Sequence, residues 1–184
     1  MKKIGHIKIE DFQKAVTPEK VRTLQILCGA LGMGILLFSG VVLFLYFQGM
    51  AKAPLPKPDA FQLSTMLSLV HGVAGISLLG MAFFLPLFIL KQVLNQEAPE
   101  EAQLGQQCFG RIMGYYIMKM GILEGVALLG LVTCLLSSMN GVLYRESAYW
   151  LNLLTPFLFW AILLTEFPTE KRILDLFIKA RPAN

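Results

Sequence analysis

Residues 111–138 read RIMGYYIMKMGILEGVALLGLVTCLLSS, and this stretch decides the fold. It is long enough to cross a lipid bilayer, because a transmembrane helix needs about 20 predominantly apolar residues. A single acid, Glu124, lies inside it between Leu123 and Gly125. A carboxylate in hydrocarbon costs roughly 3 kcal/mol on insertion scales, so Glu124 must protonate, pair or face a polar cavity. The stretch therefore predicts a membrane helix and carries the strongest functional hint in the chain.

The composition of the whole chain is typical of membrane proteins. Apolar residues make up 55% of it and charged residues 15%, whereas soluble domains contain about 25% charged residues. Neither a strand-like alternation nor a glycine-rich phosphate loop is visible in the sequence. We predict an all-α integral membrane protein, a four-helix antiparallel bundle. Its expected spans are residues 24–47, 63–90, 112–138 and 148–167.

The segments outside this transmembrane domain, residues 17–167, are short. Residues 1–16 are charged and lack the apolar region of a signal peptide, so we expect a cytoplasmic N-terminal tail. Residues 168–184 are expected to form a second cytoplasmic tail that contains an amphipathic helix. The apolar face of that helix consists of Ile173, Leu174, Phe177 and Ile178. Such a helix is expected to lie on the inner leaflet of the membrane.

The distribution of Lys and Arg predicts the orientation. Of the 16 Lys and Arg residues, thirteen lie in the N-terminal tail, in or beside the second loop, and in the C-terminal tail. The remaining three, Lys52, Lys57 and Arg145, lie in the other two loops. The positive-inside rule then places both termini in the cytoplasm of a multi-pass protein of the bacterial inner membrane. The formal net charge of +4 is no nucleic-acid signature, because the basic residues lie at the ends of spans. The expected partners are the lipid bilayer and other membrane subunits, or further copies of the chain.

Glycines are frequent in the spans, where small residues allow helix backbones to approach each other closely. We expect glycine packing positions at Gly29, Gly32, Gly34 and Gly40 in the first span, Gly75 in the second, and Gly121, Gly125 and Gly130 in the third. Gly121 and Gly125 would let a partner backbone or water approach Glu124. For the first span, packing within the chain is the favoured interpretation. The alternative is a dedicated contact between subunits.

Polar residues of the second span supply candidate neighbours for Glu124. Ser68 and His71 lie on one face of that span, and Ser77 lies deeper. We expect Glu124 to face the bundle interior, in a buried polar or ion-carrier site formed with these three residues. His71 and Glu124 differ in depth by roughly 10 Å at 1.5 Å per residue, so Ser77 is the better placed partner. Lys119 is expected to extend back to the inner interface.

The segment from Gly121 to Gly130, GILEGVALLG, resembles the carboxylate helix of rotary-ATPase c-subunits, the proteolipids, over residues 120–131. That resemblance implies an ion carrier at Glu124. The chain departs from the family in that Glu124 opens the second hairpin, whereas the proteolipid acid lies on the outer helix of each hairpin. The whole pattern is similar to small uncharacterised four-span bacterial inner-membrane proteins, a similarity that implies no activity. It consists of a Thr17-Pro-Glu-Lys start, a Glu124-Gly third span and a Phe167-Pro-Thr tail.

Two functional hypotheses follow. The first is a non-enzymatic accessory or structural subunit that packs through glycine-rich helix faces. The second is a proteolipid-like proton- or ion-translocating subunit with Glu124 as the carrier. A membrane enzyme is disfavoured because one His and one Glu are too few for a catalytic set. The three cysteines and the acids lack metal-ligand spacing, so neither a metal nor a cofactor is expected.

Overall fold

The structure is a computed structural model that describes residues 4–49, 55–97 and 103–181. Within these ranges it is helical and contains no β-strand, which confirms the all-α prediction. Four helical segments are long and apolar enough to cross a membrane, as expected of a multi-pass membrane protein. They are α2 (Pro18–Gly49), α3 (Pro58–Leu94), α4 (Leu104–Met139), and η5 (Ser147–Leu153) continued by α5 (Leu154–Thr165). The loop residues 50–54 and 98–102, with Lys52, lie outside the described residues.

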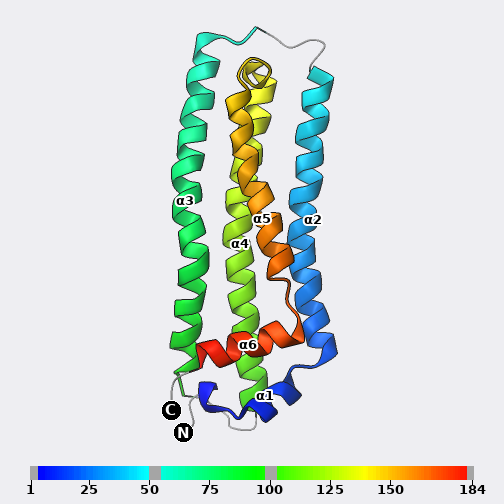
Figure 1. Cartoon of the computed structure of the whole chain (residues 1–184), viewed down its shortest axis with the longest axis vertical. Helices are drawn as coiled ribbons and strands as arrows, with labels where there is room; N and C mark the ends of the chain where they lie inside the picture. The colour runs from blue at the N-terminus through cyan, green and yellow to red at the C-terminus, as the bar shows by residue number, and fades with distance from the viewer. Residues whose placement is uncertain (1–3, 50–54, 98–102, 182–184) are drawn as a thin grey trace.

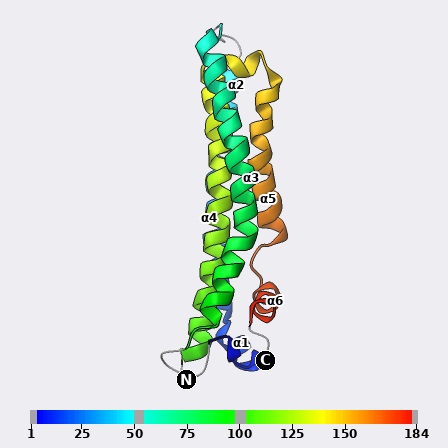
Figure 2. The same cartoon turned by 90° about the vertical axis from the view of Figure 1, so that its left-hand side faces the viewer.

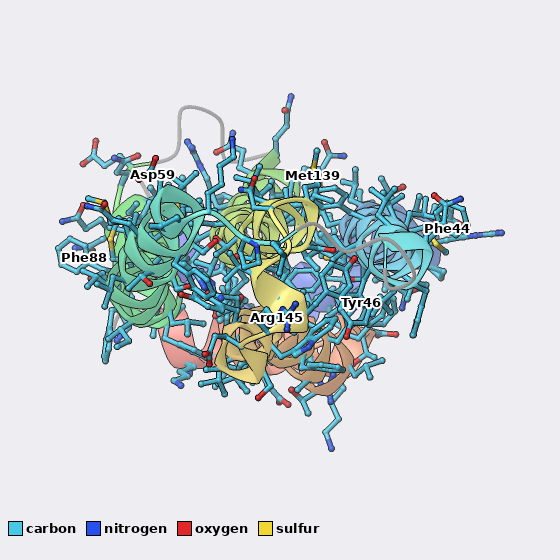
Figure 3. All side chains as sticks on the ribbon, turned by 90° about the horizontal axis from the view of Figure 1, so that it is seen from above. Phe44, Tyr46, Asp59, Phe88, Met139 and Arg145 are labelled. Atoms are coloured by element: carbon cyan, nitrogen blue, oxygen red, sulfur yellow. The ribbon has the colours of Figure 1, made fainter. Side chains whose placement is uncertain are left out.

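Helix α4 is the centre of the bundle. Seen from above, α3, α4 and α2 form a row, and α5 lies against one side of it (Figure 3). Figure 1 shows the same arrangement from the side, with α5 in front of α4. Although α2 and α3 are consecutive in the sequence, each packs mainly on α4. The fully buried side chains of α4 include Ile112, Met120, Leu131 and Cys134.

The three long helices extend beyond the membrane core. At 1.5 Å per residue, the 36 residues of α4 span about 54 Å, whereas the hydrocarbon core is about 30 Å thick. Their lower ends in Figure 2 carry the short helices η1 (Ile4–His6), α1 (Ile9–Ala15) and α6 (Glu170–Ala180). We call this part of the molecule the terminal end, because both ends of the chain lie there.

The terminal end differs from the two tails expected from the sequence. Helix α1 packs against α4, and the rings of Phe12 and Phe177 stack with their centroids 4.3 Å apart. Helix α6 is amphipathic as predicted, but Ile173 and Phe177 on its apolar face are fully buried by the protein rather than by lipid. The projecting ends of the long helices provide this surface, which the sequence analysis did not anticipate.

The opposite end of the bundle is held together by aromatic residues. Tyr144, the last residue of η4 (Val142–Tyr144), stacks on Tyr46 of α2 with ring centroids 4.8 Å apart. Its hydroxyl donates a hydrogen bond to the Tyr46 carbonyl at 2.9 Å. Trp150 meets Tyr46 edge-on, also at 4.8 Å. The chain turns into this cluster at Gly141, whose φ of 76° suits glycine.

The glycines predicted to pack helices divide into two groups. Gly32, Gly75 and Gly130 face neighbouring helices, and Gly34 faces the Glu124 carboxylate. The other four have no heavy atom within 4 Å of where a Cβ would lie: Gly29, Gly40, Gly121 and Gly125. For Gly29 and Gly40, in the first span, the favoured interpretation of packing within the chain is wrong, and Gly121 and Gly125 are open to a partner backbone or water. Their faces point away from the helices that the chain itself supplies.

The contrast between Gly130 and Gly121 yields the first prediction. A Cβ at residue 130 would lie 2.6 Å from the Thr155 hydroxyl and 2.9 Å from His71, and closer still to the Asn152 carbonyl. We expect Gly130→Ala to lower the free energy of unfolding by about 1–3 kcal/mol, because overpacking displaces backbone. Gly121→Ala, with open space around it, should leave the stability unchanged. Thermal unfolding in detergent measures both, and equal midpoints would contradict the packing described.

Candidate functional site

Glu124 lies at the edge of α4 that faces α2. Its side chain is partly exposed, and its Oε1 atom would be 3.7 Å from a Cβ on Gly34. No hydrogen bond or ion pair to it is formed among the described residues. The expected interior position is therefore wrong, because the buried face of α4 at this level is occupied by Leu123, Val126 and Ala127. Glu124 retains both oxygen atoms for a group that the described chain does not supply.

His71 is in a separate polar network, away from Glu124. Its Nδ1 atom is 2.7 Å from Asn152 Oδ1, and its Nε2 atom is 2.9 Å from Thr155 Oγ1. The Asn152 amide nitrogen donates to Ser68 Oγ at 2.9 Å and to the Tyr149 carbonyl at 2.8 Å. This network connects α3 to the fourth span. Each member is held by a neighbour in the same network.

The network fixes the protonation pattern of His71. Because the Asn152 nitrogen already donates twice, its Oδ1 atom is the acceptor facing His71, and Nδ1 carries the hydrogen. In the neutral imidazole, Nε2 then accepts from the Thr155 hydroxyl at 2.9 Å, which is shorter than the 3.4 Å from that hydroxyl to the Val126 and Asn152 carbonyls. A hydroxyl, an imidazole and an amide in this order have the geometry of a nucleophile, its base and its orienting group. However, His71 is 4% exposed and Gly130 packs directly over it, which leaves no room for a substrate.

The predicted site residues are thus not brought together. Ser68 joins His71, whereas Ser77 is exposed on the outer side of α3 and Glu124 lies against α2. The sequence analysis missed Asn152 and Thr155 as partners of His71. The available signal was their i, i+3 spacing at the start of an otherwise apolar span.

Lys119 forms a second polar site nearer the terminal end. Its ammonium donates to Glu166 Oε2 at 2.5 Å and lies 4.4 Å from the centroid of the Phe83 ring. Lys119 is only 3% exposed, whereas the side chain of Glu166 is 36% exposed. The lysine therefore reaches the end of the fourth span, near the interface, but the protein buries it there. It stays within the bundle because Glu166, at the end of α5, supplies the counter-charge there.

The chain matches no protein-family model, no curated protein and no solved structure. Within the part of the chain that the structure describes, no three His, Cys, Asp or Glu residues are grouped as metal ligands would be. Function must therefore be inferred from the arrangement of the chain's own residues. Three elements are available: the unpaired Glu124, the closed His71 network and the Lys119–Glu166 pair.

The Lys119–Glu166 pair yields the second prediction. Glu166→Gln would leave a buried ammonium without a counter-charge, which is costly when a buried pair is broken. Since Glu166 is about one-third exposed, we discount that cost for solvent screening and expect a loss of about 1–3 kcal/mol in unfolding free energy. The double variant Lys119→Met, Glu166→Gln should recover most of it, because no buried charge remains. Unfolding in detergent measures all three proteins.

Lys179→Met is a matched control, because Lys179 is exposed on α6. It should unfold like the wild type. If Glu166→Gln were as stable as that control, the ion pair would have no structural role.

Proposed function

We propose that this chain is a non-enzymatic accessory subunit of a membrane complex and binds a transmembrane helix of its partner on one face of α4. The proposal rests on a row of four glycines along α4 at which a Cβ would meet no heavy atom of the described chain within 4 Å. They are Gly110, Gly114, Gly121 and Gly125. Their spacings of four, seven and four residues place them on one side of the helix. We call this side the glycine face.

The glycine face is exposed, although Gly110 and Gly114 also line a small cavity against α3. Gly121 and Gly130 are nine residues apart, which corresponds to about 180° around an α-helix. Gly130 contacts the fourth span, so the glycine face lies on the far side of α4 from α5. In a bilayer, burial of apolar side chains drives helix association weakly, and small residues that permit close backbone contact are favoured at helix interfaces. An open row of glycines is therefore suited to bind another helix.

Glu124 supports the same proposal. It lies at the edge of the glycine face, three residues from Gly121, and forms no hydrogen bond within the described chain. An unpaired carboxylate at this depth is unfavourable, and a partner that supplies a donor would remove this cost. The accessory function also accords with the His71 network, in which both ring nitrogens are engaged by Asn152 and Thr155.

The third prediction tests the glycine face. We expect the wild type, extracted in mild detergent, to sediment as a heteromeric complex larger than the monomer. Gly121→Leu and Gly125→Leu should release the chain as a folded monomer, because a leucine prevents close approach of the partner helix. Gly72→Leu is the matched control, since Gly72 is exposed on α3 and also has open space around it. Analytical ultracentrifugation, with circular dichroism as a check of folding, measures the outcome.

A second candidate function, ion translocation, is favoured by the same unpaired carboxylate and by the proteolipid resemblance. If the chain translocates ions, it should sediment as a closed ring of identical copies. In that case dicyclohexylcarbodiimide should label Glu124, and Glu124→Gln should fold but abolish ion flux. For an accessory subunit, the glutamine variant should still assemble, because an amide donates and accepts hydrogen bonds. A wild type that sediments as a monomer would contradict both functions.

The orientation is part of the proposal, and the fourth prediction tests it. The Lys and Arg asymmetry of thirteen to three supports cytoplasmic termini in a bacterial inner membrane. Lys57 is exposed just before α3, and Lys179 is exposed on α6 at the terminal end. In a variant without native cysteines, Lys57→Cys should react with an impermeant maleimide in intact spheroplasts. Lys179→Cys should react only after the membrane is opened, and the reverse pattern would invert the topology.

A further inference from the structure

A small open cavity with charged and hydroxyl groups in its lining lies at the terminal end, where the fourth span leaves the apolar part of the bundle. It is lined by Tyr115, Tyr116, Glu166, Arg172 and Leu176, with a volume of about 170 Å³. Pockets for drug-sized ligands measure about 300–1,000 Å³, so this cavity suits a much smaller group. Its walls come from α4, from the segment after α5, and from α6, which crosses the bundle there (Figure 1).

The charges around the cavity favour an anion. Lys119 and Glu166 neutralise each other at 2.5 Å, so Arg172 gives the cavity a net positive charge. The Arg172 guanidinium is held in place by a hydrogen bond from Nη1 to the Phe167 carbonyl at 3.0 Å. This leaves its Nη2 and Nε hydrogens as donors. A planar guanidinium with free donors is well suited to bind phosphate oxygens.

Two tyrosine hydroxyls add further donors. Tyr115 and Tyr116 are adjacent on α4, and within the described residues neither hydroxyl forms a hydrogen bond. Tyr116 is 4% exposed, but its hydroxyl oxygen is not buried and is open to the cavity that this residue lines. A ligand with several acceptor oxygens would satisfy both tyrosines and the arginine at once. A phosphate group provides such oxygens in a compact form.

The position of the cavity indicates where such a group would come from. Glu166 follows the last residue of α5, Thr165, and α6 begins four residues later at Glu170. The cavity therefore lies at the level where apolar chain gives way to charged chain, which is the level of lipid headgroups. Basic pockets between membrane helices at this level bind anionic headgroups.

We propose that this cavity is a binding site for a phosphate group, held by Arg172 and the hydroxyls of Tyr115 and Tyr116. The ligand is the phosphodiester of a phospholipid in the leaflet at the terminal end, or a free phosphate with the same oxygens. The site is independent of the glycine face, which lies on another side of α4. It gives the chain a lipid or phosphate contact in addition to its proposed helix partner.

The fifth prediction tests this site with the full-length protein released from detergent for native mass spectrometry. Dioleoylphosphatidylglycerol is the lipid probe, and dioleoylglycerol, which has the same chains without phosphate, is the reference. We expect the wild type to retain the phospholipid and not the diacylglycerol. Arg172→Gln should lower the bound fraction about tenfold, because it removes the charge-assisted hydrogen bonds to the phosphate oxygens. Tyr115→Phe should lower it by a smaller factor.

Lys171→Gln is the matched control, because it removes the same charge from the adjacent exposed position of α6, outside the cavity lining. Retention by this variant should equal that of the wild type. Competition with inorganic phosphate distinguishes the two sources of the phosphate group. If millimolar phosphate displaces the phospholipid, and this displacement depends on Arg172, the site is assigned to free phosphate. Equal losses in Arg172→Gln and Lys171→Gln, or equal binding of the diacylglycerol, would overturn the proposal. Tyr115→Phe keeps the test valid if Arg172→Gln fails to fold.

Discussion

At residue 130, helix α4 comes close to three residues of other segments at once, because glycine has no side chain. Gly130 allows the backbone of Asn152, the hydroxyl of Thr155 and the ring of His71 to approach α4 together. The hydrogen bonds that His71 shares with Asn152 and Thr155 then connect α3 to the fourth span across this point. In lipid, close backbone packing and such polar contacts contribute much of the association between helices. The position of α3 and α5 around α4 therefore depends on one glycine and the network above it.

The polar side chains of the bundle differ in whether the described chain supplies a hydrogen-bond or charge partner for them. The two nitrogens of His71 and the ammonium of Lys119 are engaged by partners within the fold. Glu124 lies beside Gly34 and forms no hydrogen bond or ion pair within the described residues. A satisfied polar group within a membrane stabilises the structure and has little capacity to bind anything else. An unsatisfied one beside an open glycine face retains that capacity, which is why the proposed function is centred on Glu124.

The excess length of the long helices has a consequence for the termini. Since α2, α3 and α4 project beyond the hydrocarbon core, they provide apolar surface outside it, and α1 and α6 cover that surface with Phe12 and Phe177 in contact. The short α5 ends earlier, and the chain crosses back over α4 as α6. The difference in length between α5 and its neighbours leaves the cavity beside Arg172. The sequence indicated the membrane spans, but neither the extension of α3 and α4 beyond them nor the covering of the terminal end was readable from it.

The sequence by itself determined the helical class, the four spans, the amphipathic character of α6 and the isolation of Glu124 among apolar residues. These properties depend on composition and on periodicity along one helix, which are local. Only the tertiary structure decided which faces meet: that His71 pairs with Asn152 rather than approaching Glu124, that Ser77 points outward, and that Gly130 is packed while Gly121 is open. The physical reason is that helices in a bilayer are apolar on every side. Hydrophobic periodicity therefore does not indicate which face of a helix points into the bundle. Close packing between segments far apart in the sequence determines that face.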